Sequence, residues 1–251
     1  RPEVVVDHVL DHAQPGGVRG VNEASVGVRA AVGLVDGEPR HPVVAPAAVA
    51  VERRHRHQFD EVDAQVDQVR QLLDRFRREL RRADAVIVGD YGKGVVTQPL
   101  LDEIKRLCRS HGVWLSLDPK PVHNLNLNNL SLITPNRKEA FELARLHDET
   151  RAPNPLADAN LMQAARRLLA ELRPAVLLIT LGEQGMLLCR RNDEPVHIPT
   201  VAQEVFDVSG AGDTVIAIFT MAIAAGAGAL EAAVIANHAA GIVVGKVGTA
   251  T

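Results

Sequence analysis

Cysteine is scarce in this sequence of 251 residues, in which Cys108 and Cys189 are the only two. They form no CxxC pattern and no Cys/His cluster with zinc spacing, so a reducing cytoplasm is the expected compartment. A strong excess of charge is also lacking, because the formal net charge is −3 at pH 7. The chain therefore offers no electrostatic attraction to nucleic acid or to an anionic membrane, and we expect neither as a partner.

Targeting and membrane-spanning segments are lacking as well. The opening residues, RPEVVVDH, have no apolar core of the kind found in signal peptides. One uncharged run extends from Thr214 to Leu230, but it falls short of the roughly 20 residues that a membrane span needs, and AGAGA interrupts it. We interpret this run as a buried helix of a soluble protein, in a chain long enough to bury a sizeable core.

From about Val69 onward, apolar strands alternate with helices of amphipathic spacing. The expected strands are ADAVIVGD, VWLSLD, LSLIT, AVLLITLG and a neighbouring GMLLCRR. The expected helices are TQPLLDEIKRLCRSHG, NRKEAFELARLH, ADANLMQAARRLLAEL and two apolar helices in the last fifty residues. This order predicts an α/β fold with a mostly parallel sheet covered on both faces. Ligands of such folds bind beyond the carboxyl ends of the strands, where Asp90, Asp118, Asn136 and Gly182 lie.

Residues 1–68 have a different composition. They contain no Ile, Lys, Met, Tyr or Trp, and they hold five of the ten histidines. No strand-then-helix rhythm is visible in them. We expect either a loop-rich subdomain or mobile tail, or a stretch translated out of frame from a GC-rich gene. The predicted organisation is therefore an atypical segment over 1–68 and an α/β core over 69–251.

The stretch DVSGAGDT, residues 207–214, places two glycines and two carboxylates directly before an apolar helix. Gly210 and Gly212 allow the backbone to curl, so that several N–H groups at the helix N-terminus point at one place and form an anion hole. Together with Asp213 as a proton acceptor, such a hole suits phosphoryl transfer. The alternative is an ordinary helix N-cap in which Asp213 faces the helix dipole.

Six motifs occur in an order that resembles a known family: DYGKG, DPK, TPNRKEA, TLGEQG, FDVSGAGDT and ANHAAGIVVGKVGT. The chain resembles the ribokinase-like (PfkB) carbohydrate kinases, and within them the branch that phosphorylates D-glycero-β-D-manno-heptose 7-phosphate. The resemblance covers about residues 70–251. It implies a three-layer ribokinase-like sandwich, with ATP and Mg²⁺ as cofactors and a small sugar phosphate as the substrate.

The resemblance implies a role for each residue of the glycine turn. Asp213 is the expected catalytic base, and it also faces the substrate. The backbone amides of Ala211, Gly212 and Asp213 are the expected anion hole, and Gly210 permits the turn.

The resemblance also implies a nucleotide site built from three motifs. Its expected residues are Asn136, Arg137, Lys138 and Glu139, then Thr180, Gly182, Glu183 and Gly185, and finally Asn237. Glu139 is expected to help hold Mg²⁺ through water, because its spacing from Asn136 puts both on the first turn of one helix. The alternatives are a capping carboxylate for Glu139, an ordinary turn for the TLGEQG loop and a polar residue on an amphipathic helix for Asn237.

The sugar side is less complete. Asp90, Lys93 and Lys120 are expected to face the sugar or its phosphates, although a lysine at a strand end is usually only solvated. PGGVRGVN offers Gly16, Gly17 and Asn22, but the spacing does not match the Gly-Gly…Asn turn of the family. No lid strands are evident, so we expect a degenerate or missing lid and, in place of the lid-mediated dimer of the family, a monomer or a weak dimer.

The implied reaction is ATP-dependent phosphorylation of the C1 hydroxyl of the heptose 7-phosphate, which feeds ADP-heptose and lipopolysaccharide core synthesis. No H-x-G-H motif occurs, so we expect no nucleotidyltransferase activity in these residues. The alternatives are a kinase for another small sugar, and a non-catalytic nucleotide-binding remnant without the lid.

Overall fold

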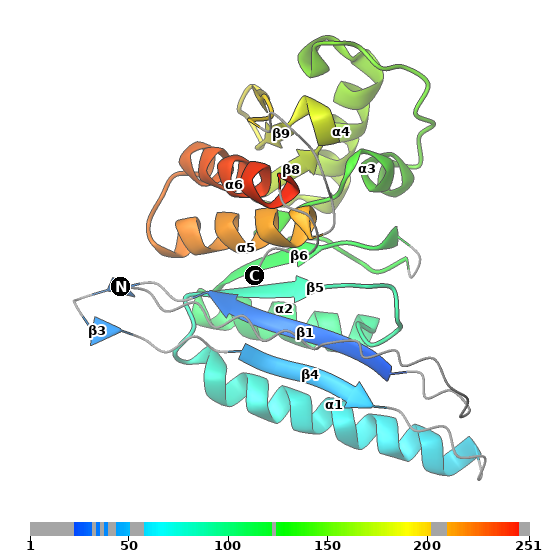
Figure 1. Cartoon of the computed structure of the whole chain (residues 1–251). Coiled ribbons are helices and arrows are strands. Elements are labelled where there is room, and N and C mark those ends of the chain that lie inside the picture. Colours follow the sequence, from blue (N-terminus) through cyan, green and yellow to red (C-terminus); the bar gives the residue numbers. More distant parts are fainter. Residues whose placement is uncertain are drawn as a thin grey trace.

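The computed structural model describes residues 23–31, 34–35, 38–39, 44–50, 58–121, 124–201 and 210–245, and before residue 68 it describes the backbone alone. Eight strands form one sheet in the order β10-β9-β8-β7-β6-β5-β1-β4. The strands β5 to β8 pair in parallel, whereas the outer strands on both sides pair antiparallel. The predicted α/β fold is confirmed, with its parallel part at the centre of the sheet (Figure 1).

The strands are short, as is usual in such sheets. Their bounds in chain order are β1 (Glu23–Ala31), β4 (Val44–Ala50), β5 (Ala85–Gly89), β6 (Trp114–Asp118), β7 (Leu132–Ile133), β8 (Val176–Thr180), β9 (Met186–Cys189) and β10 (Val196–Ile198). A separate pair consists of β2 (Leu34–Val35) and β3 (Glu38–Pro39).

Helices cover both faces of the sheet and make three layers (Figure 1). The helices are α1 (Gln58–Leu80), α2 (Gln98–His111), α3 (Arg137–Ala144), α4 (Ala159–Leu172), α5 (Ala211–Ala224) and α6 (Ala229–Val244), with short turns η2 (Pro155–Ala157) and η3 (Gly182–Gln184). Helices α1 to α4 pack on one face and α5 and α6 on the other. Along β8, Leu177 and Ile179 face the first layer while Val176 and Leu178 face the second, as the period of two requires.

The local sequence explains where the helices begin and end. Thr97 caps α2 by accepting from Leu100 N, Pro99 lies in the first turn, and Gly112 ends the helix in the left-handed region. At α3 a capping box joins Asn136 and Glu139. These caps fix the first turn of α3 at the end of β7, which places it at the carboxyl edge of the sheet.

Each strand and helix expected after residue 84 is present. Neither β10 nor the long α1 was expected, and α1 runs across the division of the chain at residue 68. Within 1–68 the backbone of β1 and β4 extends the sheet beyond β5. The residues Gly16, Gly17 and Asn22, and residues 207–209 of the acidic turn, lie outside the described residues. The division of the chain and the missing lid stay predictions.

Two expectations drawn from composition can be compared with the structure. Cys108 and Cys189 are free and buried, and burial raises the pKa of each thiol to about 12, so neither is reactive near neutral pH. Among the described residues, no helix combines the length and apolar character that a membrane crossing requires.

Candidate active site

Gly210, the first described residue of the glycine turn, leads directly into α5. Gly210 adopts a φ of 77°, in the left-handed region that favours glycine, and α5 begins at Ala211. The amides at the start of an α-helix have no acceptor within the helix, so those of the first turn are available to a ligand. Gly210 is the N-cap of α5 and Asp213 is its third residue, so Asp213 is not the cap itself. It lies in the first turn, where a carboxylate faces the positive end of the helix dipole, as the alternative expected, and its role as the base stays a prediction.

The side chain of Asp213 lies beside a second carboxylate and a phenol. A small cavity at the junction of β5, β6 and α5 is lined by Ile87, Gly89, Tyr91, Asp118, Asp213, Ile216 and Ala217. Tyr91 donates a hydrogen bond from its hydroxyl to Asp213 Oδ1 at 3.4 Å. Asp118 is the last residue of β6, so the parallel strands bring its carboxylate to the same edge of the sheet as the start of α5.

Lys120 pairs with two of the carboxylates at this edge. Its Nζ donates to Glu139 Oε1 at 2.5 Å and lies 3.6 Å from Asp118 Oδ2. Burial opposes the charge on Lys120, but the hydrogen bond to Glu139 and the two carboxylates raise the pKa of the ammonium group above its ordinary value. Lys120 is therefore engaged inside the site instead of being merely solvated.

Burial raises the pKa of Asp118 to about 6. Lys120 opposes this rise, whereas the negative charges of Glu139 and Asp213 add to it, and Thr134 Oγ1 donates to Asp118 Oδ1 at 3.4 Å. A carboxyl group with a pKa displaced by desolvation and like charges, in a cluster at the edge of a parallel sheet, is typical of functional sites.

Glu139 has the capping role that was the alternative to metal binding. Its Oε2 accepts from Asn136 N at 2.9 Å, and Asn136 Oδ1 accepts from Glu139 N at 3.0 Å. The other oxygen, Oε1, faces Lys120. The capping box thus fixes the carboxylate, and one of its oxygens points toward Asp118 and Lys120 without taking part in the cap.

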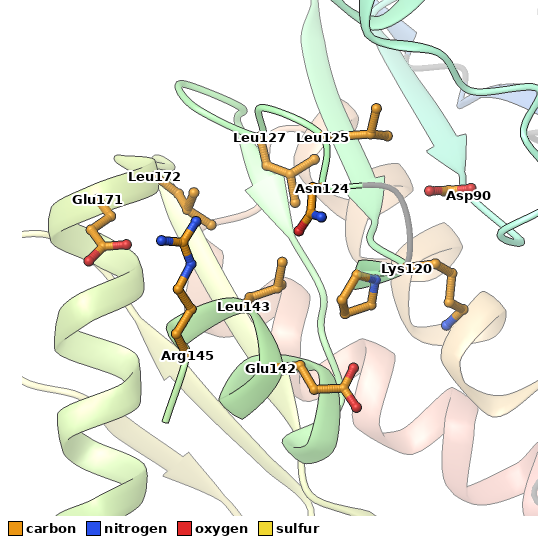
Figure 2. Close-up of a pocket in the computed structure, with 11 residues that line it drawn as sticks. Asp90, Lys120, Asn124, Leu125, Leu127, Glu142, Leu143, Arg145, Glu171 and Leu172 are labelled. Atoms are coloured by element: carbon orange, nitrogen blue, oxygen red, sulfur yellow. The ribbon is translucent and has the colours of Figure 1, made fainter. Parts of the chain in front are cut away.

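Two of the residues expected on the sugar side lie on one cleft. A cleft of about 400 Å³ is lined by Asp90, Lys120, Pro121, Asn124, Leu125, Leu127, Glu142, Leu143, Arg145, Glu171 and Leu172. Figure 2 shows Asp90 and Lys120 at one side of it and Arg145 with Glu171 at the other. Asp90 is buried; its Oδ1 accepts from Gly92 N, while its Oδ2 has no hydrogen-bond partner among the described residues. The exposed Lys93 is not part of the cleft lining.

The residues expected to hold the nucleotide meet at two places. Asn136 and Thr180 form a parallel bridge, which joins the first turn of α3 to the end of β8. Gly185 has a φ of 85°, and a Cβ on it would lie 2.1 Å from Ile198 O, so only glycine fits there. Asn237 Nδ2 donates to Pro199 O at 2.7 Å, which ties α6 to the same segment. Gly182 and Glu183 are exposed in the η3 turn.

Arg137 and Lys138 are placed differently. Lys138 is exposed and pairs with Glu142 one turn along α3 at 3.8 Å. Arg137 is buried, and its guanidinium binds Asp148 through Nε and Nη2 and Asp158 Oδ2 at 2.9 Å. Asp158 is the N-cap of α4, so Arg137 connects α3 to α4. A nucleotide contact by Arg137 or Lys138 stays a prediction.

The carboxylates at this edge fit Mg²⁺ in the way that nucleotide enzymes usually hold it. Among the described residues, no group of three or more metal-ligating side chains forms a ready cage. Mg²⁺ in nucleotide sites is commonly held by one or two carboxylates together with substrate phosphates and waters. Glu139 Oε1 and Asp118 Oδ2 are hard oxygen donors that already face a cationic group, the Lys120 ammonium. The donor set therefore suits a Mg²⁺ ion that arrives with the nucleotide.

Sequence reasoning did not assign a role to two residues of this site. The sequence places Asp118 at the end of a predicted strand and Tyr91 within the DYGKG motif, and neither position by itself indicates a role. The DPK motif held a signal for Asp118, because a carboxylate two residues before a lysine at a strand end is placed to share its charge. No sequence signal indicates that Tyr91 reaches α5, since its partner is 122 positions away.

The chain belongs to the pfkB family of carbohydrate kinases, whose family model matches residues 47–251. The match extends from the middle of β4 through both layers of helices and includes every described residue of the site above. The family expected from the six motifs is therefore confirmed.

Similar curated proteins point to one branch of this family. The chain is 41% identical over 185 residues to the bifunctional protein HldE of Desulfatibacillum aliphaticivorans. This alignment covers 74% of this chain and 36% of that protein. It is 38% identical over 246 residues to the bifunctional protein HldE of Shewanella putrefaciens, covering 95% of this chain and 49% of that protein. The chain thus spans half the length or less of these relatives.

Solved structures confirm the ribokinase-like fold. The structure of Arabidopsis thaliana ribokinase complexed with ribose and ATP has a TM-score of 0.60 at 22% identity, covering 91% of this chain and 65% of that one. A ribokinase from Thermotoga maritima has a TM-score of 0.55 at 24% identity, covering 69% of this chain and 54% of that one. At these identities the likeness concerns the fold alone.

The first prediction concerns the buried arginine. Arg137→Met should lower the free energy of unfolding by about 3 kcal/mol, because it leaves the fully buried Asp158 carboxylate without its cation. Urea denaturation measures the change, and Arg167→Met, which breaks an exposed pair with Glu171 on α4, is the control expected to change it by less than about 0.5 kcal/mol. Equal effects of the two substitutions would contradict the structural role of Arg137.

The second prediction concerns Asp118. A pKa raised to about 6 means that the folded state holds this proton more tightly than the unfolded chain. The resulting stabilisation is present below about pH 4 and is lost as the pH rises through 6. Asp118→Asn should therefore be more stable than the parent chain above pH 7, by about 3 kcal/mol for a shift of roughly two units, with the difference vanishing near pH 4.

Urea denaturation at several pH values between 4 and 8 measures this difference. The control is Asp193→Asn, which breaks an exposed pair with Arg190 and should change the free energy of unfolding by less than about 0.5 kcal/mol. A difference between Asp118→Asn and the parent chain that does not vary with pH would refute the assignment.

Proposed function

We propose that this chain transfers the γ-phosphoryl group of ATP to the C1 hydroxyl of D-glycero-β-D-manno-heptose 7-phosphate. The product is the 1,7-bisphosphate, which serves ADP-heptose and lipopolysaccharide core synthesis. The observation that carries the proposal is the position of Asp213 in the first turn of α5, within one small cavity with Asp118. Family membership supports the reaction class, and the similarity to HldE proteins supports the heptose branch.

Each group in the site has a task in this reaction. Asp213 accepts the proton of the attacking hydroxyl, which makes the oxygen a better nucleophile. The first-turn amides of α5, freed by the turn at Gly210, stabilise the negative charge on the transferred group. Mg²⁺, when bound with the nucleotide, supplies positive charge to the phosphate oxygens, and Glu139 and Asp118 are the residues that would hold it.

The sugar is received on the other side of this edge. Asp90 Oδ2 is buried without a hydrogen-bond partner, which is costly unless a ligand supplies a donor. A sugar hydroxyl at the cleft provides such a donor. Lys93 follows three residues later, and its side chain is exposed. Its flexible stem allows the ammonium group to move toward a substrate phosphate and pair with it.

A third prediction tests nucleotide binding apart from the sugar. Mg·ATP at millimolar concentration should raise the melting temperature by several degrees, because a ligand that binds the folded state alone stabilises it by about 2.7 kcal/mol at a hundredfold excess over Kd. Mg²⁺ without nucleotide should shift it by less than about 1 °C, since the described residues hold no ready metal cage. Thermal melts that show no shift with Mg·ATP would count against the whole proposal.

A fourth prediction tests the catalytic base. Asp213→Asn keeps the size of the side chain and leaves the backbone amides in place. Transfer from ATP to heptose 7-phosphate should fall by roughly two to four orders of magnitude, the range for a general base, while the affinity for Mg·ATP stays within a few-fold. The assay is product formation under saturating ATP, run beside a thermal melt.

The control for this variant is Asp193→Asn, because Asp193 lies in an exposed ion pair with Arg190 and lines neither cavity of the site. It should keep full transfer. Unchanged transfer in Asp213→Asn, with an unchanged melt, would refute the role of Asp213. A parent chain that binds Mg·ATP and transfers nothing to any sugar would favour the non-catalytic remnant.

A further inference from the structure

The phenol of Tyr91 connects the segment after β5, which holds Asp90, to the first turn of α5, which holds Asp213. Tyr91 follows β5 directly after Asp90, and its hydroxyl donates to Asp213 Oδ1 at 3.4 Å in the first turn of α5. This distance is long for an O–H···O contact, whose usual range is about 2.5–3.0 Å. Hydrogen bonds to catalytic groups are often long in unliganded enzymes and tighten when the substrate is bound.

The ring of Tyr91 packs at a defined position on the sheet. A Cβ placed on Gly89 would lie 3.5 Å from Tyr91 Cε2 and 3.6 Å from the phenol oxygen, so the ring packs against the backbone of Gly89 at the end of β5. The residue is still 43% exposed, and it lines the small cavity with Asp118 and Asp213. The ring is thus held against the sheet while its hydroxyl reaches into the site.

The Tyr91 hydroxyl can offset the repulsion between the carboxylates of Asp118 and Asp213. Asp118 and Asp213 line the same small cavity, and their charges interact. Left alone, the carboxylate of Asp213 gains by turning away from Asp118. A neutral O–H donor on Asp213 Oδ1 offsets this tendency, because a hydrogen bond to a charged acceptor is stronger than one between neutral groups.

We propose that Tyr91 is a positioning residue for Asp213: it occupies Oδ1 and leaves Oδ2 to take the proton of the sugar hydroxyl. This inference rests on the proposed function, in which Asp213 is the base. It also explains why Asp90 and Tyr91 are neighbours in the DYGKG motif. Asp90 receives the sugar and its neighbour Tyr91 orients the base, so one turn at the end of β5 sets the hydroxyl and its proton acceptor relative to each other.

The test begins with Tyr91→Phe, which removes the hydroxyl and keeps the ring over Gly89. The kcat of transfer should fall roughly tenfold, the effect of losing one hydrogen bond to a charged group. The KM values for Mg·ATP and for the sugar phosphate should stay within about twofold. Trp114→Phe is the matched control, since it removes an aromatic N–H that donates to Ser116 Oγ on β6, away from Asp213. Its kcat should stay within twofold, and an equal loss in both variants would overturn the inference.

A double-mutant cycle separates action through Asp213 from direct contact with the sugar. In the Asp213→Asn background, Tyr91→Phe should cost less than twofold in kcat, because the group that it positions is no longer a base. A tenfold loss in both backgrounds, or a loss that falls on the KM of the sugar, would overturn the inference while leaving the proposed function in place. A parent chain without transfer would instead defeat the proposed function.

Fluorine NMR provides a readout that needs no activity. Tyr91 is the only tyrosine in the sequence, so a protein made with 3-fluorotyrosine gives one protein-bound ¹⁹F resonance. This resonance should move in Asp213→Asn and stay within its linewidth in Trp114→Phe. A resonance that ignores Asp213→Asn would show that the phenol does not contact the carboxylate, and would overturn the inference whatever the kinetics.

Discussion

The ion pair of Lys120 with Glu139 is the interaction on which the rest of the site depends. Four parallel strands end at one edge, and this topology gathers the carboxylates of Asp118, Glu139 and Asp213 there. Like charges that are partly buried repel strongly, and a cation placed among them offsets that repulsion. Lys120 supplies that cation at 2.5 Å from Glu139 and 3.6 Å from Asp118.

The same charge balance bears on the proposed nucleotide chemistry. In the proposed reaction, this cluster of carboxylates would receive Mg²⁺ together with the phosphates of the nucleotide, and the first-turn amides of α5 would receive the phosphoryl group. The capping box at α3 holds Glu139 rigidly, so the ligand does not have to order it. The buried charge of Asp118 destabilises the fold, and under the proposed function the same charge would help to hold Mg²⁺.

Much of this arrangement could be predicted from the sequence. The spacing of apolar residues identified β5 to β9 and α2 to α6, because each of these elements is a local sequence pattern bounded by its own caps and turns. The residues expected at the sheet edge do gather there, since parallel strands leave no other place for them. Asp213 could be proposed as the base from the sequence because glycines and a carboxylate before an apolar helix form a compact local signal.

The rest depends on contacts between distant residues. Arg137 lies between Asn136 and Lys138 in one motif, yet its guanidinium turns to Asp148 and Asp158, partners that no local rule identifies. Tyr91 meets Asp213 only because β5 and α5 are neighbours in the folded sheet. The strands β1 and β4 were missed because Ala, Gly and Pro make up more than half of their residues, and such residues carry little strand signal.

The identity of the product tests the central claim most directly. Phosphorus NMR of a reaction of the purified chain with Mg·ATP and heptose 7-phosphate distinguishes a phosphate on the anomeric carbon from one elsewhere. The account predicts one new phosphomonoester signal coupled to the anomeric proton, formed in step with ADP. Phosphate at another carbon, or inorganic phosphate alone, would contradict it.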